Sequence, residues 1–345
     1  MGAVARYAYL HSRVSAMANR LLPEERLQTL VGLAPGQEGD IFQTAALAGL
    51  HLDEPSEPPS SLEQQLITLL LADFVIFVRA LSGATREFLL YWAYRFELSN
   101  LKAILRGKMT GQSVSVIRDQ LVDMGPFARL PVEDLLRTDD VAEMLRRLEG
   151  TPFGEIAREA RRIFEEHHEQ FALDAAIDRR YFATLSKRAH QAERGRERLL
   201  RVLVGGIIDR YNLIWLLRYR FAYHLSSAEA YYLLIPASYR LDSRQLLALS
   251  RLGSLEEVIS HLPSPFAQWL EGAKNASDVT RILDREGWRQ AEAVLNRSSF
   301  NLARVFAYMV LRDRDLRRLR AVIKGRRLKI NLEQIYEAAG LAATG

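Results

Sequence analysis

A helical pattern of apolar and polar positions occurs three times along the chain, each time after a carboxylate. Leucine follows the carboxylate by four residues, and two aliphatic residues follow it by seven and eight. These spacings place the apolar side chains on one stripe of a helix. Basic residues at nine and eleven end each copy, where cations oppose the negative end of the helix dipole. The three copies, called the signature helices below, are residues 97–108, 209–220 and 315–326.

The polar positions of the signature helices correspond from copy to copy. The carboxylates are followed three residues later by Asn or Arg and nine residues later by a basic residue; the three sets are Glu97, Asn100, Arg106; Asp209, Asn212, Arg218; and Asp315, Arg318, Lys324. Helical rise places each carboxylate about 16 Å from the basic residues of its own copy, too far to pair. We therefore predict that it pairs with a neighbouring copy or caps a nearby helix end, in a structural role.

A second landmark recurs nearly in step with the signature helices. It is a leucine before a short apolar helix, at Leu22, Leu130 and Leu241. Successive signature helices begin 112 and 106 residues apart, about a third of the chain, and repeated units bury their apolar faces against each other. No strand pattern is found. The sequence predicts an all-α fold of three similar helical bundles around a pseudo-threefold axis: an N-terminal helix (1–21) and units 22–129, 130–239 and 240–345.

Local signals refine this prediction. Gly107 and Gly325, among the terminal basic residues, suit left-handed helix caps. Gly205-Gly206 interrupts an apolar helical run and favours a packing or kink role over ligand binding. A long charged helix is predicted from about residue 155 to 185 or beyond.

Composition excludes several classes of protein. Hydrophobic residues make up 48% of the 345 residues, enough for a sizeable core, and there is no cysteine for a disulfide or a thiolate site. The net charge of +5 comes from charges of both signs mixed along the helices, which is typical of a solvated surface. The most apolar run, residues 66–78, contains Asp73 and is shorter than the roughly 20 residues a spanning helix needs.

The sequence contains no motif for catalysis or for a cofactor. There is neither a GxxxxGK[ST] loop nor a GxGxxG turn. An acid–histidine cluster occupies residues 165–169, but its adjacent histidines, His167 and His168, point about 100° apart on a helix and do not form a zinc pair. We expect no catalytic residue, cofactor or metal.

One face of the last signature helix is densely basic. The face is formed by Arg317, Arg320, Lys324 and Arg327. It is either a solvated surface or a binding surface for an acidic partner, and the sequence leaves both open. Nucleic acid is less favoured, because Asp313 and Asp315 interrupt the basic run and no aromatic residues interleave with it.

An acid-x-x-Asn-Leu helix ending in Leu-Arg-Gly-Lys, in a three-unit helical chain, resembles the C subunit family of the V/A-type rotary ATPases, whose eukaryotic counterpart is the d subunit of the V-type ATPase. The resemblance is most specific at residues 97–108, is supported at 209–220, and is degenerate at 315–326, where Arg318 replaces the asparagine. The opening Tyr7-Ala8-Tyr9 also looks like this family.

The resemblance implies a non-catalytic rotor subunit without nucleotide. It implies a funnel of three bundles seated on the membrane proteolipid ring, peripheral on the cytoplasmic side, into which central-stalk subunits of the ATPase head dock. The alternative is a helical adaptor or nucleic-acid-binding protein that uses the basic C-terminal helix.

Overall fold

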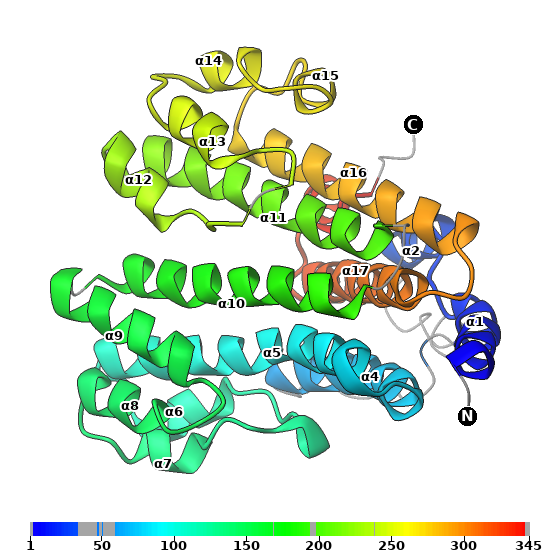
Figure 1. The fold of residues 1–345 in the computed structure, drawn as a ribbon, viewed down its shortest axis with the longest axis horizontal. Coiled ribbons are helices and arrows are strands. Elements are labelled where there is room, and N and C mark those ends of the chain that lie inside the picture. The colour runs from blue at the N-terminus through cyan, green and yellow to red at the C-terminus, as the bar shows by residue number, and fades with distance from the viewer. Residues whose placement is uncertain are drawn as a thin grey trace. The chain divides into compact units, whose positions relative to one another are not determined.

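The computed structural model describes residues 3–33, 47, 50, 59–167, 169–193, 198–237 and 239–341. Within these ranges every regular element is a helix, which confirms the predicted all-α class (Figure 1). The chain divides into two compact bodies. The N/C body combines residues 1–82 with 288–345, and the central body comprises residues 83–287.

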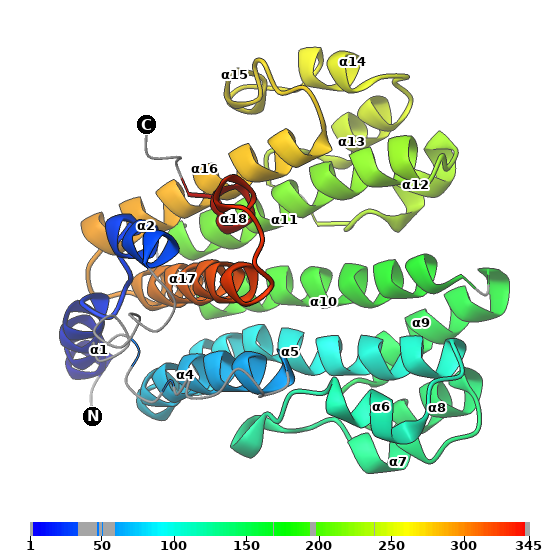
Figure 2. The same cartoon turned by 180° about the vertical axis from the view of Figure 1, so that it is seen from behind.

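In the N/C body the other helices pack around the last signature helix. This helix, α17 (Leu302–Arg327), contacts α1 (Ala3–Ala18), α2 (Glu24–Gly32), α4 (Pro59–Ala80) and α18 (Leu332–Ala339). Figure 2 shows α2 and α18 beside it. Because neighbours surround α17, it buries residues on every side, charged ones included. The last part of α16 (Ala276–Arg297) completes this body.

In the central body two signature helices flank a third long helix. Helix α10 (Gln170–Ala192) packs against α5 (Gly83–Met109), α9 (Gly154–His167) and α11 (Leu199–Leu217) (Figure 1). Short helices follow α5 and α11. After α5 come α6 (Val114–Asp119), the 3-10 turn η1 (Gly125–Phe127), α7 (Val132–Leu136) and α8 (Val141–Leu148); after α11 come the π-helical turn η2 (Arg218–Ala222), α12 (Ser227–Leu233), α13 (Ser243–Ser250), α14 (Leu255–Ser260) and α15 (Phe266–Trp269).

The apolar stripe predicted for each signature helix is buried. All nine side chains at positions four, seven and eight are at most 5% exposed: Leu101, Ile104, Leu105, Leu213, Leu216, Leu217, Leu319, Val322 and Ile323. In the central body the stripe of α11 packs in one core cluster with the second-landmark Leu241 and with apolar residues of α13. The helical period read from the sequence therefore identifies the faces that build the core.

Two local predictions need correction. The charged helix predicted through residue 185 is two helices, because α9 ends at His167 and α10 begins at Gln170. Acidic residues are concentrated in the sequence around the end of α9. Negative charge at a helix C-terminus interacts unfavourably with the negative end of the helix dipole, which disfavours a longer helix. The predicted left-handed caps are also wrong: Gly107 and Gly325 lie inside helices and have no positive φ.

These glycines instead allow close helix packing. A Cβ atom at Gly325 would lie 2.6 Å from Cγ1 of Ile335 on α18, and one at Gly107 would overlap Ile117 on α6. A Cβ at Gly205 would lie 2.5 Å from Cβ of Tyr239, so the packing role predicted for the Gly205-Gly206 pair is confirmed at its first residue.

Gly325→Ala is expected to lower the free energy of unfolding by about 1–3 kcal/mol, because the added methyl group overpacks the contact with Ile335. Urea denaturation measures this change. Gly32→Ala is the matched control, since this glycine is also helical and has open space around its Cα, so alanine there should be neutral or stabilising. When Gly325→Ala is already present, Ile335→Ala should cost less than in the wild type; equal costs in the two backgrounds would contradict the overpacking.

Candidate functional site

The first signature carboxylate binds backbone N–H groups ahead of a short helix. Glu97 Oε1 accepts hydrogen bonds from the N–H of Arg129 at 2.6 Å and of Leu130 at 2.9 Å. Leu130 is the residue before the N-cap proline of α7. One turn later, Asn100 accepts from the N–H of Val122 at 2.9 Å and donates to its carbonyl at 2.7 Å. Two side chains of α5 thus hold the segment that leads into α7.

The second signature helix repeats this arrangement. Asn212 accepts from the N–H of Ile235 at 2.8 Å and donates to its carbonyl at 3.2 Å. The carboxylate of Asp209 accepts from three successive backbone N–H groups, at 3.3, 2.8 and 3.4 Å, which belong to Tyr239, Arg240 and Leu241. The next residue along the chain is the N-cap of α13. The carboxylate again holds the start of a short helix.

The third copy makes the equivalent contact with the opposite end of the chain. Asp315 Oδ2 accepts from the N–H of Leu22 at 2.8 Å, although 293 residues separate the two, and its Oδ1 accepts from Nε of Arg314 at 2.8 Å. Leu22 precedes the N-cap proline of α2. Arg318, which replaces asparagine, donates to the carbonyl of Gly340 at 3.1 Å. The landmark leucine therefore donates its N–H to the carboxylate in all three copies, together with one or two preceding residues in the first and second.

Asn100, Asn212 and Arg318, three residues after the carboxylate, bind backbone groups at nearly the same separation along the sequence. Their backbone partners lie 22, 23 and 22 residues further on in the first, second and third copies. The π-helical turn η2 lies between Asn212 and its partner and accounts for the extra residue. In the same copy Tyr219 stands where the others have Gly107 and Gly325, and the facing position carries Ala230 in place of isoleucine. A large residue and a small residue have exchanged helices.

The basic residues at position eleven hold the other end of the short helix in two copies. Lys108 Nζ donates to the carbonyls of Leu136 at 3.2 Å and of Thr138 at 2.5 Å, at the end of α7. Arg326 donates to three carbonyls at the end of α2, at 2.8, 3.2 and 2.6 Å, which belong to Leu30, Val31 and Leu33. Cations there match the negative end of the helix dipole. In the second copy Arg220 instead binds the carbonyl of Leu225.

The basic residues at position nine have no common role. Arg106 lies 3.9 Å from Asp174, Arg218 stacks over Tyr223 at 5.5 Å, and Lys324 lies 3.4 Å from Glu63. Of the two basic positions, only position eleven has a contact that recurs between copies. The sequence spacing already marked it as a basic position in all three copies.

Burial controls the electrostatics of the signature carboxylates. Glu97 is 1% exposed, and Asp209 and Asp315 are fully buried. Burial raises the pKa of all three above its usual range, while the bound N–H groups, and for Asp315 also Arg314, act in the opposite direction.

A buried ion cluster joins α17 to α4. Asp73, 1% exposed, accepts from Tyr308 Oη at 2.7 Å, from Arg312 Nε at 3.1 Å and from Arg20 Nη1 at 2.5 Å. Arg312 is itself 2% exposed and donates to the carbonyl of Arg20 at 2.9 Å. Sequence reasoning missed this cluster. Its signal was the single acid within the apolar run of residues 66–78, which needed a partner.

Part of the basic face predicted on α17 is paired within the N/C body. Arg317 forms an ion pair with Asp313, while Arg320 and Lys324 both pair with Glu63, at 2.5 and 3.4 Å. Arg327 is exposed.

Among the residues that the structure describes, no group of three or more His, Cys, Asp or Glu side chains could hold a metal ion. The side chain of His167 and the whole of His168 lie outside these residues, so the 165–169 cluster is not tested. No helix in the described ranges is long and apolar enough to span a membrane.

The described part of the chain is all-α, and its signature carboxylates bind its own backbone. The sequence profile of the ATP synthase (C/AC39) subunit family matches residues 10–338, so the chain belongs to that family, as the resemblance predicted. It is a non-catalytic component of a V/A-type ATPase complex, and other protein subunits are its partners.

Archaeal relatives match nearly the whole chain. The C subunit of the A-type ATP synthase of Methanocaldococcus jannaschii is 25% identical over 349 residues, which cover 96% of this chain and 86% of the relative. That of Thermococcus kodakarensis is 24% identical, covering 92% and 86%, and that of Halobacterium salinarum (strain R1) is 23% identical, covering 96% of both.

Asp209→Ala is expected to lower the free energy of unfolding by about 2–3 kcal/mol, because three backbone N–H groups lose their acceptor in a buried place. Chemical denaturation measures the loss. Glu271→Ala, an exposed acid of the same body, is the control and should change stability by less than about 0.5 kcal/mol. Equal effects of the two substitutions would contradict the role assigned to Asp209.

The pKa shifts predict a direction for the pH dependence. A carboxyl whose folded-state pKa is raised binds its proton more tightly in the native state. The free energy of unfolding therefore falls as pH rises from the usual carboxyl pKa through the raised one. Asp209→Asn removes this titration, so the stability of the wild type relative to Asp209→Asn should decrease as the pH rises above about 4. Denaturation at a series of pH values tests this, and a flat or rising difference would contradict the shift.

Proposed function

We propose that this protein is the central-stalk rotor component that links the soluble shaft of a V/A-type ATPase or ATP synthase to its membrane proteolipid ring. Membership in the ATP synthase (C/AC39) subunit family supports this proposal, as do relatives named as the C subunit of A-type ATP synthases. The complex would translocate protons or sodium ions, and this protein would lie peripherally on the cytoplasmic side. Torque generated in the head would pass through it to the ring.

The observation that carries the proposal is the threefold recurrence of the carboxylate–leucine contact. With units 22–129, 130–239 and 240–345, after an N-terminal helix 1–21, each carboxylate binds the first segment of the next unit. The third carboxylate, Asp315, binds the first unit at Leu22. Such closure supports three similar bundles around a pseudo-threefold axis, and a funnel with that symmetry would offer a socket for a shaft. On this proposal the nine signature residues are structural.

Exposed side chains supply candidate contacts for partners. Large apolar residues are exposed beyond the ends of two signature helices: Val114 and Val116 after α5, and Leu328, Ile330 and Leu332 after α17. Single exposed apolar residues are ordinary, whereas contiguous exposed apolar groups mark protein interfaces, so these two groups are our candidates. The basic face, with Arg317, Arg320, Lys324 and Arg327, would complement an acidic partner surface.

The test is a pull-down of the tagged protein from gently solubilised native membranes, with bound proteins identified by mass spectrometry. Recovery of head, stalk and proteolipid subunits together is the expected result, and it should survive moderate salt because buried apolar contacts are little screened. Leu328→Ser combined with Leu332→Ser should reduce recovery of at least one partner. Glu271→Ala, which changes an exposed residue elsewhere, should leave recovery unchanged.

Failure to recover any of these subunits would overturn the proposed linkage. Recovery of nucleic acid that salt washes off would favour the alternative, because phosphate contacts weaken steeply as counterion concentration rises.

A further inference from the structure

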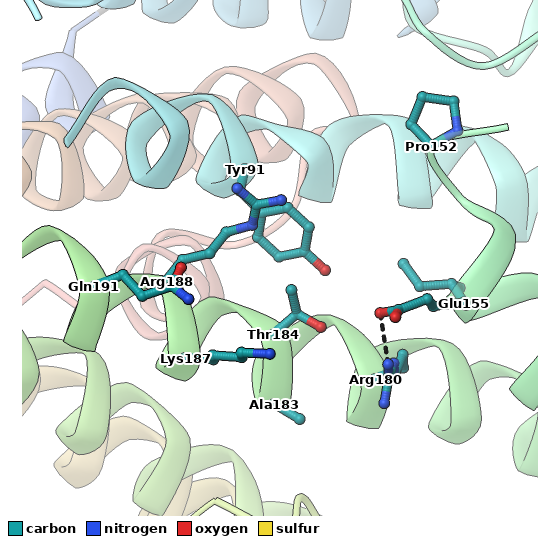
Figure 3. A pocket seen from close by; sticks show the side chains of 10 residues that line it. Tyr91, Pro152, Glu155, Arg180, Ala183, Thr184, Lys187, Arg188 and Gln191 are labelled. Carbon is teal, nitrogen blue, oxygen red and sulfur yellow. Dashed lines mark hydrogen bonds and ion pairs between the residues drawn. The ribbon is translucent and has the colours of Figure 1, made fainter. Parts of the chain in front are cut away.

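A polar pocket in the central body has no part in the signature contacts or in the proposed coupling. It has a volume of about 510 Å³ and lies between α5, the start of α9, and α10 (Figure 3). Its lining is rich in hydrogen-bond donors contributed by Tyr91, Arg180, Thr184, Lys187, Arg188 and Gln191.

The charges of the pocket are unbalanced. Arg180, Lys187 and Arg188 line it together with one carboxylate, Glu155, so two positive charges are in excess. Glu155 binds Arg180 at 2.5 Å, as the dashed line in Figure 3 shows. That bond and the charges of Arg180, Arg158 and Lys187 lower the pKa of Glu155, so it is ionised at neutral pH and already has its cation. Arg188 lies 3.6 Å from the carboxylate of Glu87, so among the described residues the charge left without an anion belongs to Lys187.

The donors of the pocket are held in position. The Arg188 guanidinium lies over the ring of Tyr91, 4.8 Å from its centroid, and 3.6 Å from the carboxylate of Glu87. Burial raises the pKa of Tyr91 to about 12, so its hydroxyl keeps the proton that it can donate. Within the described part of the chain, Nε of Arg180 and Nε of Arg188 are buried and have no hydrogen-bond partner. A buried donor without an acceptor is unfavourable, so the protein itself leaves these two guanidinium groups incompletely satisfied.

We propose that this pocket binds the phosphate group of a small molecule. Arginine forks and a lysine ammonium suit an anion with several acceptor oxygens, and the donors outnumber what one carboxylate could use. The volume falls within the range of about 300–1,000 Å³ found for small-molecule sites, so it admits more than one phosphate. Pro152 and Ile156 supply apolar lining for the rest of the molecule. Inorganic phosphate, polyphosphate and nucleotides share this chemistry.

Titration calorimetry on the full chain at low salt tests the proposal, with inorganic phosphate, tripolyphosphate and magnesium-free ATP as probes, and with sodium chloride matched in ionic strength. At least one probe should bind at a single saturable site. Lys187→Gln should weaken that binding about tenfold or more, because it removes a charge-assisted bond. Arg251→Gln is the matched control: it removes the same charge from an exposed position of the same body and should change affinity less than twofold.

A second variant distinguishes a loss of binding from a loss of structure. Arg188→Lys keeps the charge but removes the planar fork, so it should also weaken binding while the thermal melt stays within a few degrees of the wild type. The order of affinities among the probes identifies the source of the phosphate. Absence of binding at millimolar concentrations would overturn the proposal, and so would equal losses for Lys187→Gln and Arg251→Gln, which would mean unspecific charge attraction. This proposal does not rest on the rotor function, because Lys187→Gln is expected to assemble normally in the pull-down.

Discussion

The bond between a buried carboxylate and backbone N–H groups is the interaction on which the rest of this fold depends. A long helix and a short helix that meet through leucines alone can slide along each other, because apolar contact has no direction. Glu97, Asp209 and Asp315 remove that freedom by fixing the residue where the short helix begins. In two copies a cation at position eleven fixes the other end. Burying a carboxylate opposes folding, as the raised pKa values show, and the N–H groups offset this by replacing its water.

Much of this arrangement could be predicted from the sequence, because it follows from spacing. Positions four, seven and eight lie on one stripe of any helix, and all nine residues there are buried. A carboxylate about 16 Å from the cations of its own helix must find another partner, and capping a nearby helix end was one of two predicted solutions. The landmark leucines had been recognised by position alone. Nothing in the sequence indicated that their N–H groups would be the ones bound.

The missed features depend on which helices become neighbours. Gly325 was interpreted as a cap because it stands among terminal basic residues, whereas its small size matters through Ile335 on α18. On α17 the predicted basic face stays exposed at Arg317 and Arg327, but Arg312, which lies in the same basic run, is enclosed with Asp73. A helical period shows which residues share a face. It does not show how many faces of the helix are covered by neighbouring helices. This matters most for α17, which has charged residues on every side.

The second copy shows what this architecture requires. It has an extra residue in a π-helical turn, Tyr219 in place of glycine, and an arginine that binds its own loop. Yet Asp209 and Asn212 bind the same two backbone segments as their counterparts. Packing therefore tolerates an exchange of large and small residues, while the backbone bonds of Asp209 and Asn212 do not change place. In a protein that transmits torque, as we propose, such directional bonds would resist shear between helices better than exchangeable apolar contacts.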